Sequence, residues 1–215
     1  MKKILLATVV ATSFAIPNAF AGDKVSGAYA GLDGGYAFVK GEAQVLADGL
    51  ASSLGGSATS TQTTSAAVGR IFTGYNIDKH FAVELGYQKT ADFTVTYSGV
   101  AGNRVRYSGN GNVSVSGIDY SLLIKPIETK GWDGLYAKVG GHYLDTSTDV
   151  SLTASGITGS NNTSTKGSGF LVGIGYEEPL SSTVDARVAY TYYNNVSGVS
   201  DSNANAITVG VLVKF

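Results

Sequence analysis

The chain has 215 residues, and its 15 Lys and Arg against 16 Asp and Glu give a net charge of −1. This near-neutral balance argues against a nucleic-acid-binding surface, which needs a basic stripe, and the lack of cysteine excludes disulfides, thiolate zinc sites and cysteine nucleophiles. Charged residues make up 14% of the chain, against roughly 25% in a soluble domain, while a hydrophobic fraction of 43% argues against intrinsic disorder.

The first 21 residues have the organisation of a secretory signal peptide. Lys2 and Lys3 give a positive start, an apolar run follows, and residues 18–21 (NAFA) end in a small-x-small cleavage pattern. The apolar run is shorter than the ~20 residues that a membrane-spanning helix needs. We therefore expect residues 1–21 to be removed on export and residues 22–215 to form a single domain.

From residue 27 onward, apolar residues alternate with small or polar ones at a period of two, which is the period of a β-strand. In residues 27–39, Leu32, Tyr36 and Phe38 share one face, while Asp33 and two glycines share the other. The same alternation recurs in seven further segments, which surround Arg70, Glu84, Asp119, Lys138 and Arg187 or cover residues 170–176 and 207–215.

The composition of the two faces indicates a membrane protein. One face of each segment is apolar and is bordered by tyrosines, as in the lipid-facing band of an outer-membrane barrel. The other face carries mostly Gly, Ala and Ser with about one charge per strand, which suits a narrow, crowded lumen better than bulk water. The sequence therefore predicts an all-β fold, an eight-stranded antiparallel up-and-down transmembrane β-barrel.

The connections between the predicted strands alternate strictly in length. Short links cover residues 78–80, 126–133 and 178–183, whereas long links rich in Gly, Ser, Thr and Asn cover residues 40–64, 89–112, 145–166 and 194–205. Outer-membrane barrels have short periplasmic turns and long external loops, so both termini are expected in the periplasm. We expect the four long links to be mobile extracellular loops, and Trp132, in the second short link, to be an interfacial anchor.

Several segments together resemble the OmpA-type transmembrane domain, a family of small porin-like barrels of the Gram-negative outer membrane. They are YAGLDGGYAF, RIFTGYNIDKHFAVELGY, YAKVGGHYL, DARVAYTYYNN and the terminal VGVLVKF. The last segment resembles an outer-membrane insertion signal that ends in an aromatic residue, formed here by Val209, Val211, Val213 and Phe215. The resemblance implies outer-membrane lipids, lipopolysaccharide and the barrel-assembly machinery as partners of a monomeric protein.

The family carries a charged network in the barrel interior, and Glu84 and Arg187 match two of its positions. The family's acidic residue in the sixth strand falls near Gly175, and its lysine in the fourth strand has no clear equivalent. Because a charge removed from water needs a partner, the predicted network balances three acids with three bases: Asp33, Glu84 and Asp119 with Arg70, Lys138 and Arg187.

Catalytic and metal-binding patterns are weak. His80 and His142 are too few for a zinc site, which needs three or four ligands, and neither stands in the H-x-S-N context of a lipid A deacylase. Asp145 and Asp149 lie near a predicted rim without an accompanying histidine, so a protease site is not expected. We expect no enzyme activity, no metal and no cofactor.

Two functions remain. The first is a structural and surface-interaction role, in which the loops contact host or neighbouring-cell surfaces. The alternative is a narrow pore for ions or small solutes, which an eight-stranded barrel disfavours because its interior is only wide enough for its own side chains. The predicted loops carry scattered charges and no basic cluster, so the sequence names no specific partner.

Overall fold

A computed structural model describes residues 27–39, 57–101, 104–125, 132–155 and 157–215. The expected signal peptide lies outside these residues. Within the described ranges, no helix is long and apolar enough to cross a membrane. The described residues form ten strands and one short 3₁₀ turn: β1 (Gly27–Val39), β2 (Ser57–Gln62), β3 (Ser65–Asn76), β4 (Phe81–Thr90), β5 (Phe93–Val100), β6 (Arg106–Ile124), β7 (Leu135–Ala154), β8 (Ile157–Pro179), β9 (Val184–Tyr193), η1 (Val196–Gly198) and β10 (Ala204–Lys214).

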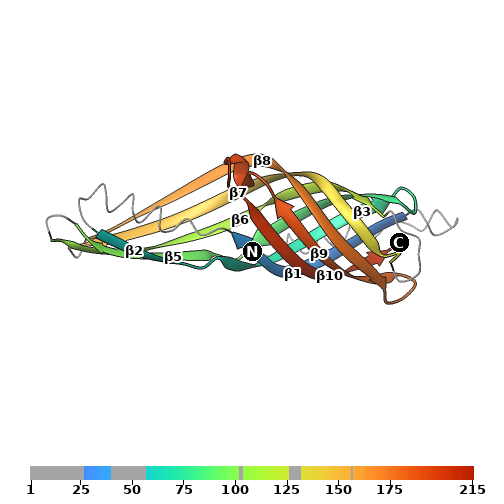
Figure 1. The fold of residues 1–215 in the computed structure, drawn as a ribbon, viewed down its shortest axis with the longest axis horizontal. Coiled ribbons are helices and arrows are strands. Elements are labelled where there is room, and N and C mark those ends of the chain that lie inside the picture. The colour runs from blue at the N-terminus through green and yellow to red at the C-terminus, as the bar shows by residue number, and fades with distance from the viewer. Residues whose placement is uncertain (1–26, 40–56, 102–103, 126–131, 156) are drawn as a thin grey trace, which may run out of the picture.

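Eight of these strands close into a ring (Figure 1). Every pairing is antiparallel, in the order β6-β4-β3-β1-β10-β9-β8-β7, and the pairing of β7 with β6 completes the circle. Closure satisfies the backbone hydrogen bonds of all eight strands, as a membrane-spanning sheet requires. The predicted eight-stranded antiparallel barrel is thereby confirmed.

The outer surface of the ring is apolar. In β4, Phe81, Val83, Leu85 and Tyr87 are exposed, whereas the residues between them are buried. The same alternation holds in β1, where Leu32 is 58% exposed. A soluble protein would turn these side chains inward, so the arrangement fits a lipid-facing band.

The interior is fuller than the predicted lining of Gly, Ala, Ser and single charges. Tyr29, Phe72 and Tyr136 are buried inside the barrel together with leucines. The glycines make room for these rings, since a Cβ on Gly74 would lie 2.3 Å from the Tyr29 ring and one on Gly175 would lie 2.3 Å from the Tyr136 hydroxyl. The small residues therefore receive large side chains from neighbouring strands.

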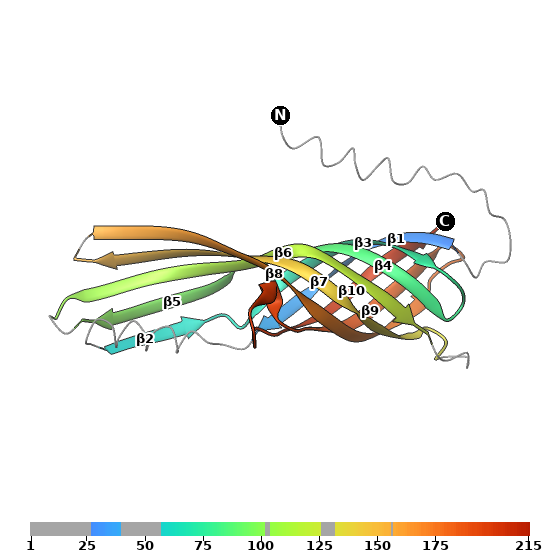
Figure 2. The same ribbon diagram turned by 90° about the horizontal axis from the view of Figure 1, so that it is seen from above.

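Three of the expected long loops contain strands: β2 occupies residues 57–62 of the expected loop 40–64, whose residues 40–56 lie outside the described ranges, and two further loops are mostly strand. The sheet continues past one end of the ring as a long extension in the order β2-β5-β6-β7-β8 (Figure 2). β7 and β8 pair without interruption from Leu135 and Tyr176 to Ala154 and Ile157. The expectation of mobile loops at 89–112 and 145–166 was therefore wrong for most of these residues. Ser and Thr are compatible with a strand when a partner satisfies the backbone and the hydroxyls pair across it, as Thr153 and Thr158 do at 2.8 Å.

The β3–β4 and β8–β9 turns lie at the opposite end from the extension (Figure 2), and most of the expected short connection at residues 126–133 lies outside the described residues. In the first, the Asp78 carboxylate accepts the backbone N–H groups of His80 and Phe81 at 2.7 and 2.8 Å. The turn before β9 is closed by the N–H groups of Leu180 and Ser181, which donate to the Val184 carbonyl. The C-terminus lies at this same end.

Candidate functional site

Arg70 lies at the centre of a group of buried charges inside the ring. Its guanidinium contacts Asp33 of β1 at 3.2 Å, Glu84 of β4 at 3.1 Å and Asp119 of β6 at 2.8 Å. The contact with Asp119 is bidentate, because Nε also donates to the second carboxylate oxygen at 2.9 Å. Charge-assisted bidentate pairs of this kind are strong and fix geometry.

Arg187 reaches the same group from the other side of the barrel. Its Nη1 lies 2.6 Å from Glu84 Oε1, and the Tyr29 hydroxyl donates to that same oxygen at 3.0 Å. The guanidinium carbon lies 4.5 Å from the Phe72 ring centroid and 5.3 Å from that of Tyr136. Cation–π attraction therefore supplements the ion pair.

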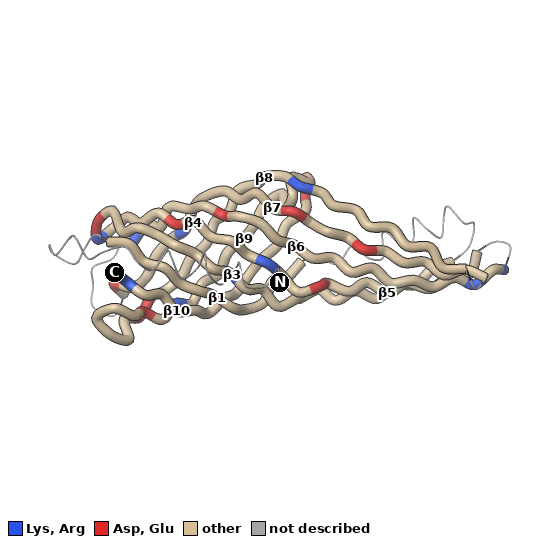
Figure 3. The backbone as a smooth tube through the Cα atoms, turned by 180° about the vertical axis from the view of Figure 1, so that it is seen from behind, with Lys and Arg blue, Asp and Glu red and all other residues tan. Residues whose placement is uncertain are grey.

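Lys138 completes the group, with its Nζ 3.6 Å from Asp119 Oδ1. The structure thus brings together all six residues singled out from the sequence. We call them the central charge cluster: Asp33, Arg70, Glu84, Asp119, Lys138 and Arg187. All six are nearly inaccessible to solvent, and Figure 3 shows that Lys, Arg, Asp and Glu are sparse along the strands.

Sequence reasoning missed a second layer of charges nearer the short turns. Glu177 of β8 accepts from Arg187 Nε at 3.1 Å and lies 2.6 Å from Lys125 Nζ. Its position two residues after Gly175, on the same strand face, was a visible signal, because inward residues recur every second position. The acidic partner placed near Gly175 therefore lies at Glu177, which pairs in register with Arg187. A further ion pair joins Lys214 and Asp185 at 2.7 Å.

The interior leaves almost no open path through the centre of the barrel. The void among the central charge cluster has a volume of about 10 Å³, and a single water needs about 10–15 Å³. Two cavities of about 270 Å³ each lie at the base of the extension and near the short turns, and a third of about 510 Å³ lies in the extension itself. The arrangement is a packed, charged plug between two open ends.

The histidines do not form a metal centre. His142 is buried, with Nε2 2.9 Å from the Asn194 carbonyl and its ring edge-on to Tyr193, while His80 lies in a short turn. No group of three His, Cys, Asp or Glu that could hold a metal occurs in the described part of the chain. Asp145 accepts from Ser164 Oγ at 2.6 Å and pairs with Lys166 at 3.2 Å.

The residues assigned to insertion and anchoring lie on the outer surface. Val209 is 63% and Phe215 is 44% exposed, and Val211 and Val213 share their face. Trp132 is 61% exposed in the turn before β7, where its carbonyl accepts the Leu135 N–H at 3.1 Å. These positions leave the side chains accessible to lipid or to an assembly factor.

The sequence model of the OmpA-like transmembrane domain matches residues 23–215. Among solved structures, Neisserial surface protein A is similar at 16% identity, covering 88% of this chain and 99% of its own, with a TM-score of 0.41. Ail of Yersinia pestis, solved with the heparin analogue sucrose octasulfate, is similar at 10% identity, covering 88% of this chain and 99% of its own, with a TM-score of 0.46. OprG of Pseudomonas aeruginosa is similar at 13% identity, covering 89% of this chain and 97% of its own, with a TM-score of 0.40. No curated protein sequence matches the chain.

Proposed function

The chain belongs to the OmpA-like transmembrane domain family, and from this premise we propose that it is a closed outer-membrane barrel with a structural and surface-contacting role. In this proposal residues 1–21 are removed on export, both termini lie in the periplasm, and the extension of the sheet lies outside the cell. Outer-membrane lipids and lipopolysaccharide surround the apolar band. The C-terminal face of Val209, Val211, Val213 and Phe215 engages the barrel-assembly machinery, and Trp132 anchors the periplasmic interface.

The observation that carries the proposal is the contrast between the two parts of the molecule. The centre of the ring is filled by the central charge cluster and aromatic rings, with a remaining void of about 10 Å³. The sheet nevertheless continues well beyond the ring in β5, β6, β7 and β8. A plugged lumen supports no role in transport, whereas an ordered extension supports presentation of a surface.

The edge of the extension is suited to contact with another protein. From Ile157 to Lys166, β8 pairs only with β7 among the described strands, and these residues are exposed. An unpaired strand edge offers a row of N–H and C=O groups that can add an extended segment from a partner. We assign this edge to contacts with host or neighbouring-cell surfaces.

Planar-bilayer recordings of the purified protein test the closed barrel. We expect no stable conductance from the wild type, and a new conductance when Tyr136→Ala and Arg187→Ala are combined, because both side chains fill the lumen. Lys166→Ala, on the exposed extension, is the matched control and should stay silent. A large, stable wild-type conductance would overturn the proposal in favour of the pore.

Shortening the extension tests the surface role. Ser147 and Ser164 face each other in register, so residues 148–163 can be replaced by an Asn-Gly turn that preserves the pairing below it. We expect normal barrel insertion, again without conductance, but reduced adhesion of expressing cells to host cells and to each other. Unchanged adhesion would contradict the assigned role.

A further inference from the structure

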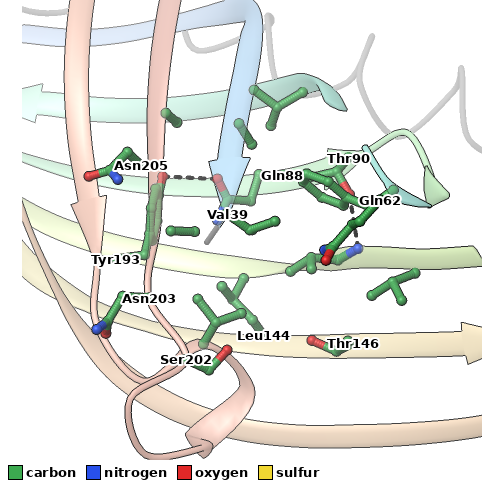
Figure 4. Close-up of a pocket in the computed structure, with 18 of the residues that line it drawn as sticks. Val39, Gln62, Gln88, Thr90, Leu144, Thr146, Tyr193, Ser202, Asn203 and Asn205 are labelled. Carbon is green, nitrogen blue, oxygen red and sulfur yellow. Dashed lines mark hydrogen bonds between the residues drawn. The ribbon is translucent and has the colours of Figure 1, made fainter. Parts of the chain in front are cut away.

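We infer that the cavity at the base of the extension is a binding site for a neutral, mostly apolar small molecule. The cavity holds about 270 Å³ and lies between the mouth of the ring, the first residues of β5 and the middle of β6 (Figure 4). This inference is independent of the surface role proposed above, since it concerns the inside of the mouth rather than the sheet edge.

Two apolar clusters face this cavity without filling it. One cluster contains Ala37, Val68 and Phe93, and the other contains Leu144 and Tyr193 with further apolar residues. The cavity lies at an open end of the barrel, so water can enter it, and an apolar ligand that displaces this water removes the apolar lining from solvent, which is favourable in proportion to the apolar area buried. A cavity with such a lining therefore favours an apolar occupant over water.

The volume sets the size of the occupant. At about 270 Å³ the cavity is many times larger than the ~10–15 Å³ that one water needs, so it has room for a molecule the size of a medium-chain alcohol. The cavity is a blind site, because the space below it, among the central charge cluster, is about 10 Å³. The occupant is therefore held at the mouth and not passed through the barrel.

The polar groups of the lining determine the charge of the occupant. Among the described lining residues, Asp201 alone carries a charge, and it is exposed. No cation lines the described wall to pair with a carboxylate, and burial of an unpaired anion is costly. Gln88 Oε1 accepts the Tyr193 hydroxyl at 2.9 Å, and its side-chain NH₂ is a donor of the kind that pairs with a ligand oxygen. A neutral molecule with one hydroxyl or carbonyl fits these groups.

The test uses 1-nonanol and its acid, nonanoate, added to the full-length mature protein in phospholipid nanodiscs at pH 8. Methyl NMR signals of Val95, Val115 and Leu144 report on the cavity, and those of Val209 report on the lipid face. We expect saturable shifts at the three cavity residues with 1-nonanol, and binding about tenfold weaker for nonanoate because its carboxylate is ionised. The Val209 signals should instead change in proportion to the alcohol dissolved in the bilayer.

Cavity-filling variants supply the decisive comparison. Val95→Trp places an indole in the cavity, while Thr94→Trp adds the same group to the opposite, exposed face of β5. We expect Val95→Trp to abolish the saturable shifts of Val115 and Leu144 and Thr94→Trp to preserve them. Val113→Trp on β6 is a second filling variant in case the first fails to fold. Saturable binding that survives in a folded filling variant, or linear shifts at all sites in the wild type, would overturn the inference.

Discussion

Arg187 and Glu84 form an ion pair of 2.6 Å across the full width of the barrel. Their strands, β9 and β4, are separated in the ring by β3, β1 and β10 on one side and by β6, β7 and β8 on the other. The pair therefore joins opposite walls, and both side chains are at most 2% exposed. This relationship links closure of the sheet to the charges in its interior.

Breaking this pair should destabilise the barrel strongly. Glu84→Gln and Arg187→Met each leave a buried charge without one partner, which typically costs ~3–5 kcal/mol. Because Glu84 keeps Arg70 and Arg187 keeps Glu177, we expect about half that range for each single variant. Urea unfolding in detergent measures the change.

The double variant should lose less stability than the sum of the single variants, because neither charge is then stranded. Lys166→Gln breaks the exposed pair with Asp145 and serves as the control, with an expected loss of ~0–1 kcal/mol. Strict additivity of Glu84→Gln and Arg187→Met would show that the two residues are not coupled.

Gly86→Val should disturb the central charge cluster although it changes no charged residue. A Cβ at Gly86 would lie 2.6 Å from Arg70 Nε, and Arg70 is held in place by three carboxylates. We expect a loss of about 1–3 kcal/mol in urea unfolding, as for overpacking of a core. Gly69→Val is the matched control, since no atom lies within 4 Å of its Cβ position; equal effects of the two variants would contradict the explanation.

The turn at Asp78 should contribute stability that depends on pH. The backbone N–H groups of His80 and Phe81 donate to the Asp78 carboxylate and hold its pKa below the ordinary value of 3.8. A pKa that is lower in the folded state adds stability above the unfolded pKa, and this stability is lost as the pH falls through the folded pKa.

Asp78→Asn should therefore be less stable than the wild type at neutral pH, and the difference should shrink as the pH falls below about 4. Urea unfolding of both proteins at each pH measures the difference in their free energies of unfolding. The other acids titrate in both proteins, so their contributions cancel in this difference. A difference that stays constant down to strong acid would show that the carboxylate charge does not matter.

Deletion of Phe215 should reduce the amount of protein assembled in the outer membrane severalfold. The exposed aromatic ring ends the face that we assign to recognition by the assembly machinery. Phe215→Tyr keeps an aromatic ring and should assemble normally, as measured by the heat-modifiable band of membrane fractions. Normal assembly of the deleted chain would refute the assignment.

Epitope tags inserted at the two ends of the barrel determine its orientation in the outer membrane. A tag inserted after Ser155, at the tip of the β7–β8 hairpin, should bind antibody on intact cells. A tag inserted after Lys79, in the short turn before β4, should bind only after permeabilisation. The reverse pattern would place the extension in the periplasm.

The strands and their lipid-facing sides could be predicted from the sequence because alternation is a local property. Leu32 and Asp33 must point to opposite faces whatever the rest of the chain does. The same period of two identifies the charged residues that point inward, and it would have identified Glu177 as well. The absence of charge on the outer face then identified that face as the one in contact with lipid.

Other features depended on which residues meet across the sheet, and this is decided only when the ring closes. The side-chain rings of Tyr29 and Tyr136 fill the lumen because their neighbours in the closed barrel are Gly74 and Gly175. Residues 145–154 and 157–166 are strands because β7 and β8 supply each other's hydrogen bonds, although their Ser and Thr content alone is typical of loops. Composition describes one segment at a time, whereas pairing, lumen filling and the 2.6 Å contact of Glu84 with Arg187 arise from register and closure.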